Sequence, residues 1–221
     1  MIRQIIIGFV TEGTTDTRFL EKIIQRSFED VAYDCKGQVE ILQVQHIRQE
    51  TGLEFIDSIK KSAEKAREIG VMILCIHVDA DETDDRAVYK NKLDPLFKQV
   101  PFKPKSESCD NFVTIVPVQM TEAWMLADNE LFKDEIGTYK SDSELGINKR
   151  VEDYSDPKET IKNAIRIARQ NETKRRRRDL KIDELYSPIG QKVDLGLLGG
   201  LESYQKFKDS IRSAYKKMNY L

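Results

Sequence analysis

The 221-residue sequence has no long hydrophobic run, because no stretch approaches the roughly 18 apolar residues that a membrane-spanning helix needs. The apolar segment at residues 1–7 is also shorter than the core of a secretory signal peptide, and acidic Glu12 follows soon after it. Only three cysteines occur, at positions 35, 75 and 109, and none belongs to a Cys-x-x-Cys pair. We therefore expect a reduced, cytoplasmic protein with no membrane contact and no structural zinc site.

Several motifs of well-known enzyme classes are absent. The sequence has no Gly-x-x-x-x-Gly-Lys-Ser/Thr segment, which excludes a P-loop ATPase, and no Gly-x-Gly-x-x-Gly segment for a dinucleotide. It has no Gly-x-Ser-x-Gly segment, the nucleophile turn of α/β-hydrolases. A function must therefore come from other residues.

Charge is distributed unevenly along the chain. The net charge is −2, but residues 1–148 carry nine more acidic than basic residues, whereas residues 149–221 carry seven more basic than acidic ones. Clustered carboxylates repel one another unless a cation lies among them. A basic segment favours phosphate or an acidic neighbour as its partner. The acidic residues 1–148 and the basic residues 149–221 therefore suggest two different functions.

Apolar periodicity predicts alternating strands and helices in the first 130 residues. A short, nearly continuous apolar run is typical of a strand buried on both faces, and apolar residues at helical spacing indicate a helix. The expected strands span residues 2–10, 39–47, 71–78 and 112–118, and the expected helices span residues 16–30, 52–69, 86–100 and 121–128. This alternation predicts an α/β fold whose parallel sheet of about four strands is flanked by helices.

The pattern changes after about residue 131. We expect a polar loop at residues 134–155, a helix at 157–170, a glycine-rich loop at 190–200 and a terminal helix at 201–220. The expected organisation is a core at residues 1–130 with a mostly helical, basic extension at residues 131–221 packed on it.

Three of the expected strands lead into acidic residues. Glu12 follows the first strand, Asp79 and Asp81 follow the most apolar strand, and Glu122 follows the last one. Ligands of open α/β sheets bind beyond the carboxyl ends of the strands, and a chain that stays extended through Asp81 would project both aspartates to one side. Such carboxylates favour a hard divalent cation, Mg²⁺ or Mn²⁺. A cation there could neutralise a phosphate and activate a water molecule.

Each acid also has a purely structural interpretation. Glu12 fits an ordinary loop acid, and Asp79 fits a turn residue that ends a strand. Asp16 and Glu122 each fit a first-turn acid that complements a helix dipole. The spacing of Asp79 and Asp81, directly after eight apolar residues, favours a functional role for this pair.

Two further residues near these acids are interpreted as packing residues. His77 lies inside the apolar strand and is expected to be a core histidine with its hydrogen bonds satisfied. Trp124 is expected to anchor the packing of its helix rather than to stack on a ligand.

The ordered set of these elements resembles the Toprim domain, which occurs in topoisomerases, DnaG-type primases and OLD-family nucleases. The segment Val10-Thr11-Glu12-Gly13-x-x-Asp16-x-x-Phe19-Leu20 is similar to the V-E-G-x-(S/T)-E-x-x-F-L of its nuclease branch, with Asp16 where a Glu is usual. Two later segments, Pro117-x-Gln119-x-x-Glu122-Ala123-Trp124 and Asp156-Pro157-Lys158, resemble motifs of one uncharacterised bacterial Toprim-like family. Members of that family are often encoded beside ABC-type ATPases, as in phage-defence modules.

The resemblance implies a metal-dependent nuclease. Glu12 would be its acid/base or metal-coordinating glutamate, Asp79 and Asp81 would hold Mg²⁺, and Glu122 with Asp16 would complete a second metal position. Two ions can clamp the attacking and leaving oxygens of a phosphodiester. The resemblance implies nucleic acid as the substrate, with DNA favoured over RNA, and an ABC-type ATPase as a partner; the oligomeric state stays open.

A basic run closes the expected helix at residues 157–170. It consists of Lys174, Arg175, Arg176, Arg177 and Arg178. Cations at a helix end complement the dipole, but five in a row exceed that need, so we expect them to contact nucleic-acid phosphates. An acidic surface of an ATPase subunit is an equally sensible partner.

Three alternatives remain open at this stage. The segment Asp79-Ala80-Asp81-Glu82-Thr83 matches the Asp-x-Asp-x-Thr of haloacid-dehalogenase-type phosphatases, in which the first Asp is the nucleophile. That alternative leaves Glu12 and Glu122 without a role. A receiver-like module with Asp79 as phospho-acceptor is the second alternative. The third is a non-catalytic Toprim-like subunit that binds a partner.

Overall fold

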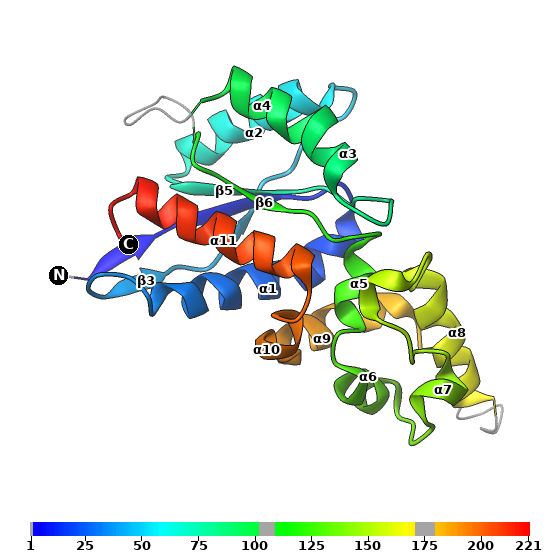
Figure 1. The fold of residues 1–221 in the computed structure, drawn as a ribbon. Coiled ribbons are helices and arrows are strands. Elements are labelled where there is room, and N and C mark those ends of the chain that lie inside the picture. Colours follow the sequence, from blue (N-terminus) through cyan, green and yellow to red (C-terminus); the bar gives the residue numbers. More distant parts are fainter. Residues whose placement is uncertain (1, 102–108, 171–179) are drawn as a thin grey trace.

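A parallel four-stranded sheet forms the centre of the protein. The computed structural model describes residues 2–101, 109–170 and 180–221 (Figure 1). The strand order is β4–β2–β5–β6, and every neighbouring pair is parallel. The strands span Gln45–His46 (β4), Ile7–Val10 (β2), Ile73–His77 (β5) and Phe112–Ile115 (β6). The α/β fold with a parallel sheet of about four strands is therefore confirmed.

Two of the expected strands are divided. The first is split at Ile6 into β1 (Arg3–Ile5) and β2, and the second is split into β3 (Val39–Ile41) and β4. β1 and β3 pair in a separate parallel two-stranded sheet. Within one apolar run the chain thus pairs first with β3, through β1, and then with β4 and β5, through β2. Apolar periodicity does not reveal such a change of partner strand.

Helices cover both faces of the four-stranded sheet. Figure 1 shows α2 (Phe55–Glu68), α3 (Arg86–Val88) and α4 (Asp94–Gln99) on one face, and α1 (Thr14–Ala32) and α11 (Glu202–Lys217) on the other. A π-helical turn, η1 (Tyr89–Leu93), joins α3 to α4. The core therefore lies in two layers, one on each side of the strands.

The side chains of β5 show why this strand is apolar throughout. Side chains of a strand alternate between its two faces. Leu74 and Ile76 belong to the apolar cluster that contains α2 residues, whereas Ile73 and Cys75 belong to the cluster that contains α1 and α11 residues. All five residues of β5 are buried. A strand with helices on both faces has no solvent side, so it needs no polar alternation.

Three short helical elements interrupt the region that we expected to be a polar loop. The expectation of a loop at residues 134–155 is wrong, because α6 (Asn129–Ile136), α7 (Asp142–Leu145) and the 3₁₀ turn η2 (Val151–Asp153) lie there. Their ends are fixed locally: the Ser141 and Glu144 side chains form a capping box at the start of α7. Gly137 and Gly146, both left-handed, end α6 and α7.

The glycine-rich segment is also helical. The expectation of a loop at residues 190–200 is wrong, because α9 (Tyr186–Lys192) and α10 (Leu195–Leu198) occupy most of it. Gly190 lies in α9 against α1, where an added Cβ would come within 2.8 Å of the Phe19 carbonyl oxygen. This glycine serves close helix packing rather than a turn, which its sequence context does not reveal.

The remaining helices complete the C-terminal part of the protein. They are α5 (Thr121–Met125), α8 (Pro157–Arg169) and the 3₁₀ turn η3 (Ile182–Glu184). The expected helices at residues 121–128, 157–170 and 201–220 are thus present as α5, α8 and α11, and the C-terminal region is helical as expected. Apolar side chains of α8, α9 and α11 share one cluster with α1 and the strands.

The two ends of the described chain meet at the amino end of the strands. The backbone N–H of Lys36 donates to the Tyr220 carbonyl oxygen over 2.8 Å. The guanidinium of Arg3, in β1, lies 4.8 Å from the centre of the Tyr220 ring. Figure 1 shows the N and C labels close together beside β3. Among the described residues, no helix is long and apolar enough to cross a membrane.

Candidate active site at the carboxyl edge of the sheet

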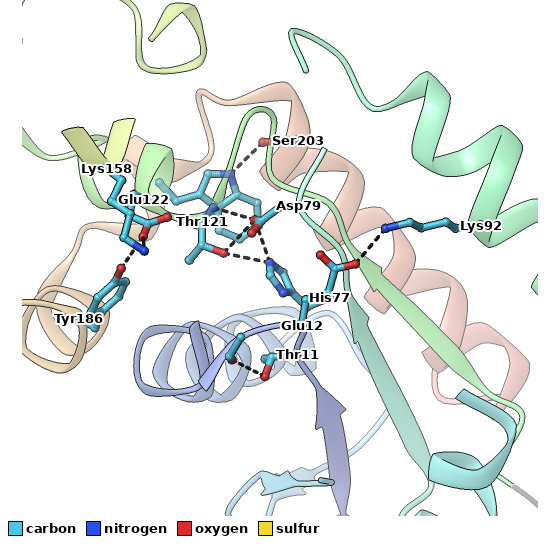
Figure 2. A network of polar contacts seen from close by, with 12 residues as sticks. Thr11, Glu12, His77, Asp79, Lys92, Thr121, Glu122, Lys158, Tyr186 and Ser203 are labelled. Atoms are coloured by element: carbon cyan, nitrogen blue, oxygen red, sulfur yellow. Dashed lines mark hydrogen bonds and ion pairs between the residues drawn. The ribbon is translucent and has the colours of Figure 1, made fainter. Parts of the chain in front are cut away.

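The carboxyl ends of β2, β5 and the segment after β6 bring three of the predicted acids to one edge. Glu12 lies two residues after β2, Asp79 lies two residues after β5, and Glu122 lies in the first turn of α5. Figure 2 shows these side chains above the ends of the strands. Because parallel strands end at the same side of a sheet, residues far apart in the sequence meet there.

Asp16 joins this edge through a close contact with Gly13. Asp16 lies in the first turn of α1 and is only 7% exposed. A Cβ added at Gly13 would lie 2.6 Å from the Asp16 carboxylate oxygen Oδ2. A side chain at position 13 would therefore force the Asp16 carboxylate to shift, so the observed position of that carboxylate favours glycine here.

Asp79 is fixed by hydrogen bonds to one of its two oxygens. Its Oδ1 accepts from the Thr121 backbone N–H at 2.8 Å and from the Thr121 hydroxyl at 3.2 Å. His77 Nε2 lies 3.2 Å from the same oxygen and 2.9 Å from the Thr121 hydroxyl (Figure 2). No hydrogen bond to Oδ2 is formed by the described residues. The second oxygen is thus left for a ligand.

Asp81 reaches the edge in a different way from the one expected. The condition under which both aspartates would project to one side, a chain that stays extended through Asp81, is not met, because β5 ends at His77 and Asp81 has a φ of +54°. Partial loss of water around the Asp81 carboxyl raises its pKa, and the charges of Asp79 and Glu12 raise it further. Asp81 therefore lies within electrostatic reach of both acids, although it is exposed and its strand has ended.

Glu122 is buried and contacts two side chains, those of Tyr186 and Lys158. The sequence does not indicate that these two residues meet at Glu122. Its side chain accepts a short hydrogen bond from the Tyr186 hydroxyl and lies 3.3 Å from Lys158 Nζ. Figure 2 shows Lys158 and Tyr186 approaching Glu122 from different helices, α8 and α9. Burial, and then the hydrogen bond to Glu122, raise the pKa of Tyr186. No pattern near residue 186 could reveal a partner 64 residues away.

Glu12 also has a lysine partner. Lys92 Nζ, from the turn η1, lies 2.9 Å from Glu12 Oε1 (Figure 2). Both side chains are more than a third exposed, so water screens this ion pair. Lys92 was not singled out in the sequence, because a lysine within a helical stretch is an ordinary surface residue.

Carboxylates crowd together at this edge, and some of them are buried away from water. Burial raises the pKa of Asp16 to about 6; the charge of His77 lowers it, and those of Asp79 and Glu122 raise it. Burial lowers the pKa of His77, but its hydrogen bond to Asp79 and the charges of Asp79, Asp16 and Glu12 outweigh burial and raise it. Asp16 and His77 therefore hold their protons to a higher pH than the same groups do in water.

The two residues interpreted as packing residues are buried. Trp124 is fully buried, donates from Nε1 to the Ser203 hydroxyl at 2.8 Å and packs edge-on against Tyr204. His77 is also buried, but it does more than fill the core, because it contacts Asp79 and Thr121 at the edge. Its Nδ1 has no hydrogen-bond partner among the described residues.

The donor set at this edge suits Mg²⁺ in type, but the described residues do not form a ready-made cage. Glu12, Asp16, Asp79, Asp81 and Glu122 offer only carboxylate oxygens, the ligands that hard divalent cations prefer. Within the described ranges, no group of three or more His, Cys, Asp or Glu side chains is arranged to hold an ion. Mg²⁺ needs less than such a cage, since it keeps several waters and uses one or two carboxylates together with substrate phosphates.

The predicted phosphate contacts fall in another part of the chain. Lys174, Arg175, Arg176, Arg177 and Arg178 lie outside the described residues, so their predicted contact with nucleic acid stays a prediction. The helix that leads to them, α8, ends at Arg169.

The comparisons with known proteins give one match. The model of a family described as a domain of unknown function (DUF4276) matches residues 11–214. No curated protein and no solved structure matches the chain. The matched range includes all five acids of the edge.

Proposed function

We propose that this chain, which belongs to the DUF4276 family, is a metal-dependent phosphodiester hydrolase that acts on nucleic acid. The observation that supports the proposal is the convergence of Glu12, Asp79 and Glu122 at the ends of parallel strands, with Asp16 buried beside them. A buried carboxyl group whose pKa is raised, as that of Asp16 is, is typical of sites that bind cations or carry out proton transfer.

Mg²⁺ or Mn²⁺ is the proposed cofactor. Asp79, through its second oxygen, with Asp81 and Glu12 would hold one ion, and Glu122 with Asp16 would serve a second position. When bound, the metal would neutralise the phosphate and lower the pKa of an attacking water. The hydrogen bonds from Thr121 and His77 orient the Asp79 carboxylate before any cation arrives.

Nucleic acid is the proposed substrate, with DNA favoured over RNA. The basic run at residues 174–178 would contact its phosphates. We also propose that the protein works in the cytoplasm, as the effector of a phage-defence system, together with an ABC-type ATPase. These parts of the proposal depend on the resemblance to the Toprim-like family and on the charge of the C-terminal part.

A non-catalytic, partner-binding subunit is the second candidate. The ion pairs Lys92–Glu12 and Lys158–Glu122 favour it, because each lysine already neutralises an acid that would otherwise attract a metal. In a hydrolase, these lysines would have to turn from the carboxylates to the metal-bound phosphate. The two candidates therefore differ in whether a divalent cation displaces the lysines.

Incubation with plasmid DNA, single-stranded DNA and tRNA in Mg²⁺ or Mn²⁺ tests the proposal. We expect cleavage by the wild type and a loss of at least about a hundredfold in Glu12→Ala and Asp79→Asn, since each removes charge that would hold the metal. Asp79→Asn keeps an oxygen that can accept from Thr121, so its fold should persist. The matched control is Asp57→Asn, which removes an exposed acid of α2.

A direct metal titration separates the alternatives. Isothermal titration with Mn²⁺ should give binding to the wild type and to Asp57→Asn, and weaker binding to Asp79→Asn. Cleavage that survives both substitutions at the edge would remove the hydrolase proposal. Release of phosphate from small phosphomonoesters that depends on Asp79 but not on Glu12 would instead indicate a haloacid-dehalogenase-type phosphatase.

A further inference from the structure

Glu122 and Asp79 are held in the same way, each through one of its two carboxylate oxygens. Oε1 of Glu122 accepts the short hydrogen bond from the Tyr186 hydroxyl (Figure 2). Oδ1 of Asp79 accepts from the backbone N–H and the hydroxyl of Thr121. The other oxygen of each acid, Oε2 or Oδ2, receives no hydrogen bond from the described residues. Each acid thus has one oxygen that the protein fixes and one that is left for a ligand.

Tyr186 is placed by the packing of its own helix. It is fully buried, and it lies on α9, which packs closely on α1 at Gly190. A buried phenol hydroxyl needs a hydrogen-bond partner, because an unpaired buried donor costs free energy. The partner here is the Glu122 carboxylate, and a hydrogen bond to a charged group is stronger than a neutral one. Rotation of Glu122 would leave this hydroxyl unpaired in the interior, so the contact fixes the orientation of the carboxylate.

Lys158 is less suited to fix the carboxylate, although it contacts the same oxygen. Its ammonium lies 3.3 Å from Oε1 of Glu122, and its side chain is 40% exposed, whereas that of Glu122 is 4% exposed. A lysine is a point charge on a flexible stem, and water screens its attraction to the carboxylate. Lys158 therefore supplies positive charge, whereas Tyr186 supplies direction.

The contact lies beside Asp16, at the second of the two proposed metal positions. The charges of Glu122 and Lys158 both act on the Asp16 carboxyl, and the charge of Asp16 acts on Tyr186. These four groups are therefore within electrostatic reach of one another. Carboxylates that ligate a metal are themselves hydrogen-bonded by residues that orient them, and loss of such a partner weakens metal binding.

We infer that Tyr186 is a positioning residue whose hydroxyl holds Oε1 of Glu122 and leaves Oε2 for the divalent cation. This inference rests on the proposed function, because it assumes that the edge binds Mg²⁺ or Mn²⁺. The role of Tyr186 toward Glu122 is the one that Thr121 has toward Asp79. Tyr186 acts through Glu122 and does not itself contact the ion or the substrate.

Removal of one hydroxyl group tests the inference. Isothermal titration measures the affinity for Mn²⁺ of the wild type, Tyr186→Phe and Tyr204→Phe. Phenylalanine keeps the ring that fills the core, so Tyr186→Phe should fold and should bind Mn²⁺ about 10- to 100-fold more weakly. Tyr204 is the matched control, because it is also fully buried and its hydroxyl lies 2.8 Å from the Ser27 hydroxyl, not from a carboxylate. Tyr204→Phe should bind Mn²⁺ as the wild type does, and thermal unfolding checks that both variants are folded.

Two further measurements separate orientation from other effects of the hydroxyl. Glu122→Gln keeps an oxygen that can accept from Tyr186 but lacks the charge that would bind the cation. In this background Tyr186→Phe should cause no further loss, because the tyrosine acts through the carboxylate. The loss in Tyr186→Phe alone should be equal at pH 7 and pH 8. A loss that vanishes at pH 8 would show that the hydroxyl only keeps Glu122 ionised, and it would overturn the positioning role.

The remaining outcomes distinguish this inference from the proposed function. Wild-type affinity for Mn²⁺ in a folded Tyr186→Phe would overturn the inference and leave the hydrolase standing. An equal loss in Tyr204→Phe would also overturn the inference, since it would indicate a general effect of the core. A wild type that binds no Mn²⁺ would refute the proposed metal site and the inference with it. A wild type that binds Mn²⁺ but cuts no nucleic acid would refute the hydrolase, while the affinities still decide the role of Tyr186.

Discussion

Asp16 is the residue at which burial and charge oppose each other most clearly. Its carboxyl group is packed against Gly13 and faces the charges of Asp79 and Glu122, and its pKa rises to about 6 from an ordinary value of 3.8. The unfolded chain releases this proton near pH 4, whereas the folded protein holds it until about pH 6. Stability from this group is therefore complete below pH 4 and is lost as the pH rises to about 6.

The Asp16→Asn variant should remove this pH dependence. A difference of about two pKa units corresponds to about 3 kcal/mol, so at pH 7 the variant should be more stable than the wild type by up to that amount. Urea unfolding of both proteins between pH 4 and pH 7 measures the difference. It should vanish near pH 4; a difference that is constant over this range would show that Asp16 has an ordinary pKa in the folded protein.

The acids of the site could be predicted from the sequence, but their partners could not. Glu12 and Asp79 follow apolar runs, and parallel strands bring such residues together, so their neighbourhood follows from the fold class. Tyr186 and Lys92 meet Glu122 and Glu12 only through helix packing, and nothing local marks them. A pattern of this kind identifies which residues share an edge, but it does not identify the hydroxyl and ammonium groups that contact them.

At the scale of elements, α9 shows how one small residue sets the distance between two helices. Gly190 lies where α9 crosses α1, next to the backbone of Phe19, and Arg26 of α1 donates to the Gly190 carbonyl oxygen at 3.0 Å. Tyr186 is on the same helix, so the packing of α9 on α1 also places the hydroxyl that contacts Glu122.

The Gly190→Ala variant tests this packing. Alanine in an unobstructed helix would stabilise the protein by about 1 kcal/mol, but here its Cβ would lie 2.8 Å from a backbone oxygen. We therefore expect a loss of about 1–3 kcal/mol in the free energy of unfolding, measured by denaturant titration. Gln191→Ala, at an exposed position of α9, should change stability by less than about 0.5 kcal/mol. A more stable Gly190→Ala would show that the two helices are not in close contact.

Elements that bury a long apolar face follow from the sequence pattern, whereas short helices that are marked only by capping residues are missed. The buried strand β5 and the long helices α1 and α11 were all expected, because each buries a wide apolar surface. The short helix α7 was missed although Ser141 and Glu144 form a capping box and Gly146 follows it. A capping box followed by a glycine indicates a short helix. The polar composition of the segment instead favours a loop, and here the capping residues give the correct prediction.

At the scale of the whole molecule, charge of opposite sign is separated between the carboxylate edge and the C-terminal part. The acidic edge repels phosphate in the absence of a cation, so nucleic-acid binding needs basic residues elsewhere. The five basic residues at 174–178 are the densest cationic run in the sequence. We expect them to supply the salt-dependent part of the affinity.

Replacement of residues 174–178 by serine tests this expectation. The plot of log affinity for duplex DNA against log salt concentration should become shallower by roughly 0.9 for each phosphate contact that is lost. Single-residue replacements should each give a fraction of this change, and the unfolding temperature serves as the control for folding. An unchanged slope would show that the run makes no phosphate contacts and would contradict this expectation.

The meeting of Arg3, Lys36 and Tyr220 at the amino end of the strands has a practical consequence. A linker, fluorophore or solid support attached through either end would leave the molecule on the side away from Glu12, Asp79 and Glu122. A long polymer could then approach the carboxylates without obstruction while the protein is immobilised.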